Sequence, residues 1–160
     1  MGSDTPEPSP GRIVADSDVL AADLFVDGPA RACLDHLRSH DWLTLVASDP
    51  LLDDAEAVVE RLGDPDLATD WRERIEGLRE PVDHPDGDHP ALASAYHGGA
   101  MHVLSFDDRL TSATGNTMVR DRVETAVRTP DAFAALFDPA TLYPEVVGGE
   151  YPGPDRDPRA

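Results

Sequence analysis

The sequence predicts a three-layer α/β/α sandwich with a central, mainly parallel sheet of four to five strands. Short apolar runs alternate with helical patterns along the chain, which is typical of strands joined by helical crossovers. A chain of 160 residues suffices for one domain with a sizeable core, but leaves little room for a second. We expect a disordered acidic leader at 1–10, the folded domain at 11–148 and a disordered tail at 149–160.

Three apolar runs predict the clearest strands, because each is short, rich in apolar residues and bounded by polar or turn-forming residues. They are RIVA at 12–15, WLTLVA at 42–47 and MHVLSF at 101–106. Two weaker candidates are a short strand at the start of the loop 81–90 and a last strand in VETAV at 123–127.

Apolar residues at helical spacing predict helices between these strands and at the C-terminal end of the domain. The first helix is expected to begin at a Ser17 cap, and the third at Ser48 or Asp49, with Pro50 in its first turn. The remaining helices are expected at about 30–40, 64–80 and 91–99. A final helix is expected to begin at Pro130, in the segment PDAFAALF.

The composition is that of a protein adapted to strong salt. The chain has 32 acidic and 13 basic residues, a formal net charge of −19, and no lysine, so that every basic residue is arginine. In molar salt the screening length falls to about 3 Å, and self-repulsion of such a surface costs little. We therefore expect a halophilic, cytoplasmic protein. The alternatives are an acidic mesophilic protein or a nucleic-acid mimic.

Cysteine usage and hydropathy exclude several classes of protein. Cys33 is the only cysteine, which rules out an internal disulfide and a cysteine-based zinc site, and its apolar helical context predicts a buried thiol. No apolar stretch approaches the roughly 18 residues of a membrane span. The N-terminus lacks the charged and apolar regions of a signal peptide.

Four aspartates stand at the edges of apolar segments. They are Asp16, Asp54, Asp88 and Asp107. In a parallel sheet, ligands bind beyond the carboxyl ends of the strands, so these carboxylates are expected to meet in one crevice. Oxygen ligands without a lysine to neutralise them suit Mg²⁺ or Mn²⁺, and such sites commonly perform phosphoryl chemistry. Any single one of them could instead cap a helix or belong to the acidic surface, so only the joint pattern favours a site.

The order and context of these acids resemble the PIN-domain nuclease family. That family has an apolar strand followed by Asp-(Ser/Thr)-(Asn/Ser/Asp)-Val-Leu, and this chain has VADSDVL. It then has Asp-x-x-x-Leu-Ala-x-Ala, Gly-Ala and a strand ending in Ser/Thr-x-Asp-x-x-Leu, where this chain has DHPALASA, GGA and HVLSFDDRL. RTPDAF is similar to the family's Thr-Pro-x-x-Phe opening of the last helix. The resemblance covers residues 12–138.

The second acid is assigned from SDPLLDD, which is similar to the family's Ser-x-x-Leu-Leu-x-Glu and places Asp54 there, with Asp53 as the other register. The resemblance also implies supporting residues around the site. Asp18 joins the metal shell or caps the helix, and Ser105 supports the site by hydrogen bonding. The full supporting set is Ser17, Asp18, Ser105 and Asp108, the last as a candidate fifth carboxylate.

The resemblance implies a metal-dependent ribonuclease that hydrolyses RNA phosphodiester bonds, of a haloarchaeal type. Asp16 and Asp107 would bind Mg²⁺ or Mn²⁺ directly, and Asp54 and Asp88 would complete the site. RNA is the implied partner; a toxin-like role with an antitoxin, and a homodimer, stay open. The alternative is a degenerate PIN-like domain that keeps the fold and serves as a non-catalytic binding or assembly module.

Other phosphate chemistries lack residues that they need. Asp16-Ser17-Asp18 after a strand also resembles the nucleophile motif of haloacid-dehalogenase-type phosphatases, but those enzymes and receiver domains require a lysine. A P-loop needs Gly-x-x-x-x-Gly-Lys, which is absent from this chain. Structural or surface roles are expected for the histidines of the second half, whose spacing fits no helical His-x-x-x-His pair: His84, His89, His97 and His102.

Overall fold

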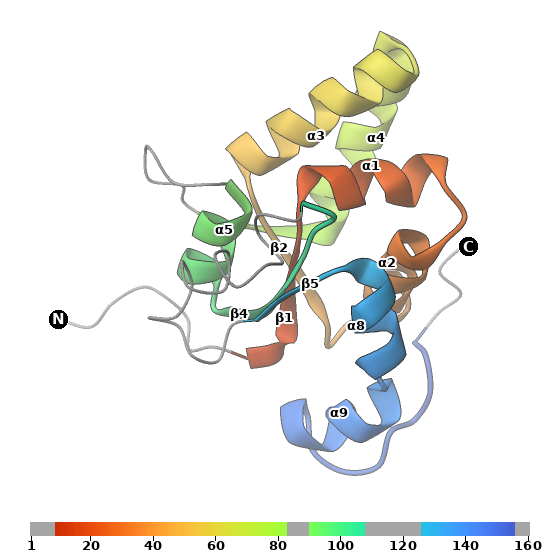
Figure 1. Ribbon diagram of the computed structural model, residues 1–160. Helices are drawn as coiled ribbons and strands as arrows, with labels where there is room; N and C mark the ends of the chain where they lie inside the picture. Colours follow the sequence, from red (N-terminus) through yellow and green to blue (C-terminus); the bar gives the residue numbers. More distant parts are fainter. Residues whose placement is uncertain (1–8, 83–89, 108–125, 156–160) are drawn as a thin grey trace, which may run out of the picture.

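A single five-stranded parallel sheet organises the molecule (Figure 1). The computed structural model describes residues 9–82, 90–107 and 126–155. The strand order is β3-β2-β1-β4-β5, and all four neighbouring pairs run parallel. The strands are β1 (Ser9–Ala15), β2 (Thr44–Ser48), β3 (Arg79–Val82), β4 (Ala100–Leu104) and β5 (Ala126–Arg128).

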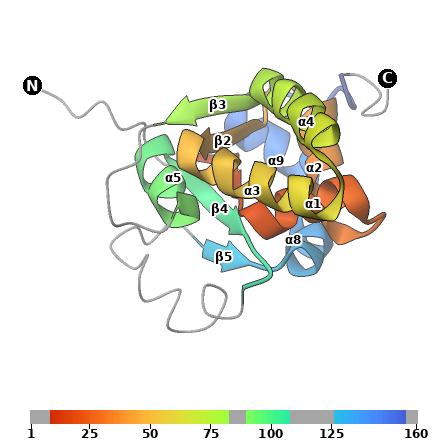
Figure 2. The same cartoon turned by 90° about the horizontal axis from the view of Figure 1, so that it is seen from above.

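Helices cover both faces of this sheet. They are α1 (Ser17–Phe25), α2 (Pro29–Ser39), α3 (Asp49–Leu62), α4 (Pro65–Leu78), α5 (Pro90–Gly98), α8 (Pro130–Leu136) and α9 (Pro139–Val146). Figure 2 shows α5 on one side of the sheet, with α1, α2 and α8 on the other. The three-layer α/β/α sandwich predicted from the sequence is therefore confirmed, with five strands in the described part of the chain.

Burial on both faces explains why the central strands are continuous apolar runs rather than alternating ones. Val14 in β1, Val46 in β2 and Leu104 in β4 are each fully buried. The packing of α5 on this core needs a glycine, because a Cβ on Gly98 would lie 2.1 Å from a side-chain carbon of Val46. The helix ends directly after it.

Side-chain caps set the helix starts, with one correction to the sequence-based expectation. Asp16, not Ser17, is the N-cap of α1, and its Oδ1 accepts a 2.8 Å hydrogen bond from the Ser17 N–H. Ser48 caps α3 by accepting from the N–H of Leu51 at 3.3 Å, as expected. One of the two carboxylate oxygens of Asp16 thus caps the helix that follows β1.

The C-terminal part contains an element that the sequence did not predict. Helix α9 follows α8 directly and carries Pro144 within it. Beyond it, within the segment expected to be a disordered tail, residues 149–155 are described. Tyr151 donates to or accepts from Nε2 of His40 across 2.6 Å, and the N–H of Asp155 donates to the Ser39 carbonyl at 2.7 Å. This stretch is packed against the end of α2.

The structure also bears on the expectations for the cysteine and for membrane-spanning helices. Cys33 is buried, its Sγ lies 3.3 Å from the Pro130 carbonyl oxygen, and burial raises the pKa of its thiol to about 12. The thiol is therefore a core group, as expected. None of the helices in the described ranges combines the length and apolarity that a bilayer crossing requires.

Candidate metal centre

The carboxyl ends of β1 and β4 lie side by side at the centre of the sheet. Ala15 pairs with Leu104, and the N–H of Asp16 donates to the Leu104 carbonyl at 2.8 Å. Asp16 therefore follows β1 at the same level at which Ser105 follows β4. This register brings residues 89 apart in sequence into contact.

Ser105 joins the two strand ends through its hydroxyl group. Its Oγ donates to Oδ2 of Asp16 at 2.9 Å and accepts from the N–H of Asp107 at 3.0 Å. Ser105 is fully buried and Asp16 is only 6% exposed, so both groups are shielded from bulk water. The serine thereby fixes the carboxylate of Asp16 relative to the chain segment that carries Asp107.

The side chain of Asp18, in the first turn of α1, lies near the end of β4 as well. Its Oδ2 accepts a 3.1 Å hydrogen bond from the N–H of Phe106, whereas its buried Oδ1 has no hydrogen-bond partner in the described part of the chain. Burial, then the charge of Asp16 and, less strongly, that of Asp107, raise the pKa of Asp18 to about 6. The carboxylate of Asp18 is therefore close enough to those of Asp16 and Asp107 to be affected by their charge. We refer to Asp16, Asp18 and Asp107 with Ser105 as the acid cluster.

The donor chemistry of the acid cluster fits a hard divalent cation. All its side-chain donors are oxygens, and a buried carboxylate oxygen without a partner is a group that a cation would satisfy. Within the described ranges, however, no group of three or more His, Cys, Asp or Glu side chains is arranged to hold an ion. The carboxylates are gathered, but they do not form a closed cage.

The carboxyl end of β2 differs from the acid cluster, because arginines neutralise the aspartate there. After β2, Asp49 accepts from Nη2 of Arg79 at 2.6 Å, and Nη1 of Arg79 donates to the Ala47 carbonyl at 2.9 Å. None of the ion pairs formed in the described part of the chain involves Asp16 or Asp18. Their negative charge is left for another ligand.

Asp54 lies apart from this hydrogen-bond network. It is exposed on α3, and no hydrogen bond or ion pair joins it to the acid cluster within the described ranges. Its neighbour Asp53 contacts Nη1 of Arg72 at 2.8 Å and so belongs to the packing of α3 against α4. Of the two possible registers, Asp54 is thus the residue whose carboxylate is not held by Arg72.

Two further predicted acids are Asp88 and Asp108. Asp88 and Asp108 lie outside the described residues, which resume at Pro90 and end at Asp107 on either side of α5 and β4. Of the predicted site residues, the structure brings together Asp16, Ser17, Asp18, Ser105 and Asp107.

Two residues near the acid cluster carried no signal in the sequence. Phe106 is expected to end the strand at 101–106, but β4 already ends at Leu104 and Phe106 is 43% exposed. Arg128 ends β5, and its carbonyl accepts a 3.0 Å hydrogen bond from the N–H of Ser105. Only the strand order shows that β5 adjoins β4, and hence that Arg128 neighbours the cluster.

Comparison with known proteins gives a family without a functional description. Neither the curated proteins nor the solved structures contain a significant match to this chain. Residues 7–159 match the model of a family described as a family of unknown function, DUF7384. Because that match spans nearly the whole chain, the protein belongs to this family.

Proposed function

We propose that the protein is a Mg²⁺- or Mn²⁺-dependent ribonuclease of the PIN type. The observation that carries the proposal is the acid cluster, in which Asp16, Asp18 and Asp107 lie near the adjacent ends of β1 and β4. One buried oxygen of Asp18 has no hydrogen-bond partner among the described residues. Repelling carboxylates in a shielded place destabilise the protein unless a cation compensates them, and such strain marks functional sites more often than structural ones.

The residues of the acid cluster suit this role in different ways. Asp16 and Asp107 would be the direct ligands, with Ser105 holding Asp16 in place and Asp18 offering its second oxygen. When bound, the cation would supply a water of lowered pKa as nucleophile and would stabilise the charge developing on the phosphoryl oxygens. Asp54 and Asp88 remain candidates for completing the site.

RNA and high salt belong to the same proposal. An acidic surface with a net charge of −19 repels a polyanion in dilute solution, but this repulsion acts over only about 3 Å at molar salt. We infer a halophilic, cytoplasmic protein that acts on RNA under those conditions. An antitoxin or a second copy of the chain would be a further partner.

A second candidate is a non-catalytic binding or assembly module. It is favoured by the absence, within the described ranges, of three acidic or histidine side chains arranged around one point. In this case the acid cluster would be a remnant whose main effect is to cap α1 and to join β1 to β4.

Titration with Mn²⁺ separates the two candidates. We expect saturable binding to the wild type in molar KCl, at least tenfold weaker in Asp16→Asn, which removes a direct ligand. Asp70→Asn, the same chemical change at an exposed position of α4, serves as the matched control and should bind like the wild type. Mn²⁺-dependent cleavage of a fluorescent single-stranded RNA by the wild type, lost in Asp16→Asn, would then establish the reaction. Absence of binding to the wild type would favour the module.

A further inference from the structure

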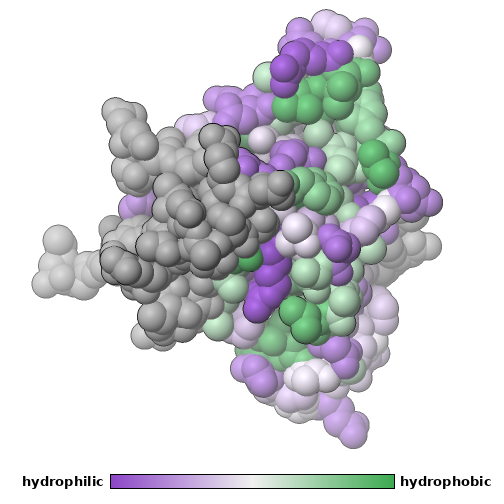
Figure 3. Space-filling view, viewed as in Figure 1, coloured by the Kyte–Doolittle hydropathy of each residue, from purple (hydrophilic) through white to green (hydrophobic). Residues whose placement is uncertain are grey.

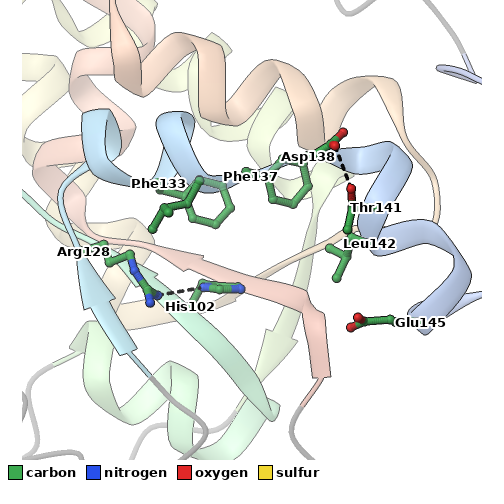
Figure 4. Close-up of a pocket in the computed structure, with 9 residues that line it drawn as sticks. His102, Arg128, Phe133, Phe137, Asp138, Thr141, Leu142 and Glu145 are labelled. Carbon is green, nitrogen blue, oxygen red and sulfur yellow. Dashed lines mark hydrogen bonds between the residues drawn. The ribbon is translucent and has the colours of Figure 1, made fainter.

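A pocket of about 450 Å³ lies between the edge of the sheet and the two C-terminal helices (Figure 4). This volume is in the range of small-molecule sites, which hold roughly 300–1,000 Å³. Figure 3 shows apolar surface in the region of α8 and α9. The residues that matter for the argument are Arg128 and His102 from the strands, Phe133 and Phe137 from α8 and its end, and Leu142 and Glu145 from α9.

Arg128 brings a positive charge into this pocket, and no carboxylate of the described residues forms an ion pair with it. Its Nη1 lies 3.4 Å from Nδ1 of His102, and none of the ion pairs in the described part of the chain includes it. By contrast, the arginines at 12, 38, 72 and 79 each pair with a carboxylate. Acidic partners are abundant in a chain with 32 acidic residues. An arginine that lines a pocket and forms none of these ion pairs is therefore suited to bind an anion from outside the protein.

His102 does not supply that anion, but it orients the arginine. Burial, and then the charge of Arg128, lower the pKa of His102 to about 4, so the ring is neutral near pH 7. A neutral imidazole can accept an N–H from the guanidinium group. The edge of the His102 ring also packs on Phe133, with ring centroids 5.1 Å apart, and this contact fixes the ring plane.

The opposite end of the pocket has the reverse polarity. Glu145 on α9 is exposed, and Figure 4 shows its carboxylate directed into the pocket, across from Arg128. The space between them is walled by Phe137 and Leu142, while Asp138 and Thr141 hydrogen-bond to each other at 2.7 Å. A ligand that fits has an anion at one end, N–H donors at the other and a flat apolar body.

The pocket begins beside the acid cluster. Arg128 pairs with Leu104, and the N–H of Ser105 donates to the Arg128 carbonyl at 3.0 Å. From that point the pocket extends along β4 toward α9 (Figure 4).

We propose that this pocket binds a nucleoside monophosphate unit, with its phosphate at Arg128 and a base bearing N–H donors, such as guanine, directed toward Glu145. Arginine matches phosphate bidentately, and a carboxylate can accept from the ring and exocyclic N–H groups of guanine. The choice of a nucleotide over other organic anions rests on the proposed function. The unit can be a nucleotide of an RNA chain or a free mononucleotide.

Calorimetric titration with GMP in EDTA tests the site without any divalent cation. The wild type should bind GMP saturably with one site, and Arg128→Gln should weaken binding at least tenfold. Arg74→Gln, an exposed arginine on α4, is the matched control and should bind like the wild type. No binding of GMP or of RNA to the wild type, or equal binding to Arg128→Gln, would overturn the proposal.

Two further variants separate the possible failures. Glu145→Ala changes an exposed residue and should reduce the preference for GMP over UMP several-fold; an unchanged preference overturns the placement of the base. The titration contains no divalent cation, so failure of the nuclease proposal leaves this result intact. A short guanosine-containing RNA that binds at least tenfold tighter than GMP, and depends on Arg128, identifies an RNA nucleotide. Equal affinity identifies the free mononucleotide.

Discussion

The buried hydroxyl of Ser105 donates a 2.9 Å hydrogen bond to Oδ2 of Asp16, across 89 residues of sequence. The Oγ of Ser105 in turn accepts from the N–H of Asp107 at 3.0 Å. One side chain therefore couples the end of β1 to the end of β4 and fixes the spacing between two predicted ligands. Its loss should affect both folding and ion binding.

Ser105→Ala should lower the free energy of unfolding by about 2 kcal/mol, because a buried carboxylate oxygen loses its donor. It should also weaken Mn²⁺ binding about 10–100-fold, the usual effect of removing a group that orients a ligand. Ser94→Ala is the matched control, since Ser94 is equally buried and its hydroxyl accepts from the Ser48 N–H at 3.1 Å. Urea unfolding and Mn²⁺ titration should distinguish the two variants. Ser94→Ala should lower the free energy of unfolding but leave Mn²⁺ binding unchanged. Equal Mn²⁺ affinities in the two variants would contradict the positioning role.

Asp18→Asn should stabilise the metal-free protein at neutral pH. The folded-state pKa of Asp18 is raised to about 6 from 3.8, so the folded protein holds a proton that the unfolded chain releases. Stability from this group is therefore present at low pH and is lost as pH rises from about 4 to about 6. The full shift would correspond to about 3 kcal/mol, and partial exposure reduces the expected gain to about 1–2 kcal/mol.

The measurement for Asp18 is urea unfolding in EDTA at about pH 4 and about pH 7.5, on either side of the window. The wild type and Asp18→Asn should be nearly equal at the acidic value and differ at the neutral one. Excess Mn²⁺ should reverse the order at neutral pH, because only the wild type keeps the third carboxylate. A variant that is less stable than the wild type in EDTA at neutral pH would refute the assigned repulsion.

Arg72→Gln should destabilise the packing of α3 on α4. The guanidinium contacts Asp53 at 2.8 Å, Glu56 at 3.0 Å and Glu76 at 2.9 Å, so its loss leaves three carboxylates without a shared cation. We expect a loss of about 1–2 kcal/mol in dilute buffer, falling by more than half at about 1 M KCl, because salt screens the remaining repulsion. Arg74→Gln on the same helix should change stability by less than about 0.5 kcal/mol. A salt-independent effect would argue for lost packing instead.

The positions of the strands and of the acid cluster follow from simple rules in the sequence. A parallel sheet buried on both faces needs continuous apolar runs, and the acids that follow two such runs reach one edge when the strands are neighbours. Asp16 and Asp107 were predictable for this reason. The sequence does not distinguish Asp16 from Ser17 as the cap of α1, because Ser and Asp are nearly equal as caps and the two residues are adjacent.

The remaining features depend on contacts distant in sequence. Helix α9 was missed because a segment with Pro139 and Pro144 has poor helix propensity, and its packing against β1 favours the helix. The sequence does not show whether Asp53 or Asp54 pairs with Arg72, because the answer depends on how α3 packs against α4. His36 and His40 have the helical spacing of a metal-binding pair. Their rings lie 6.2 Å apart, and His40 contacts Tyr151.

Deletion of the C-terminal segment after Gly149 should destabilise the domain, although its composition is that of a disordered tail. Tyr151 hydrogen-bonds to Nε2 of the buried His40 at 2.6 Å, and its ring lies 5.9 Å from that of Tyr143. A chain ending at Gly149 should lose about 2–3 kcal/mol, and Tyr151→Phe alone about 1 kcal/mol. A chain ending at Asp155 is the control and should match the full length. The ring of Trp42 lies 5.6 Å from that of His40, so Trp42 contributes a fluorescence signal from this region during urea unfolding, next to that of Trp71 in α4. Equal midpoints for the two truncated chains would mean that the contacts of Tyr151 contribute nothing to stability.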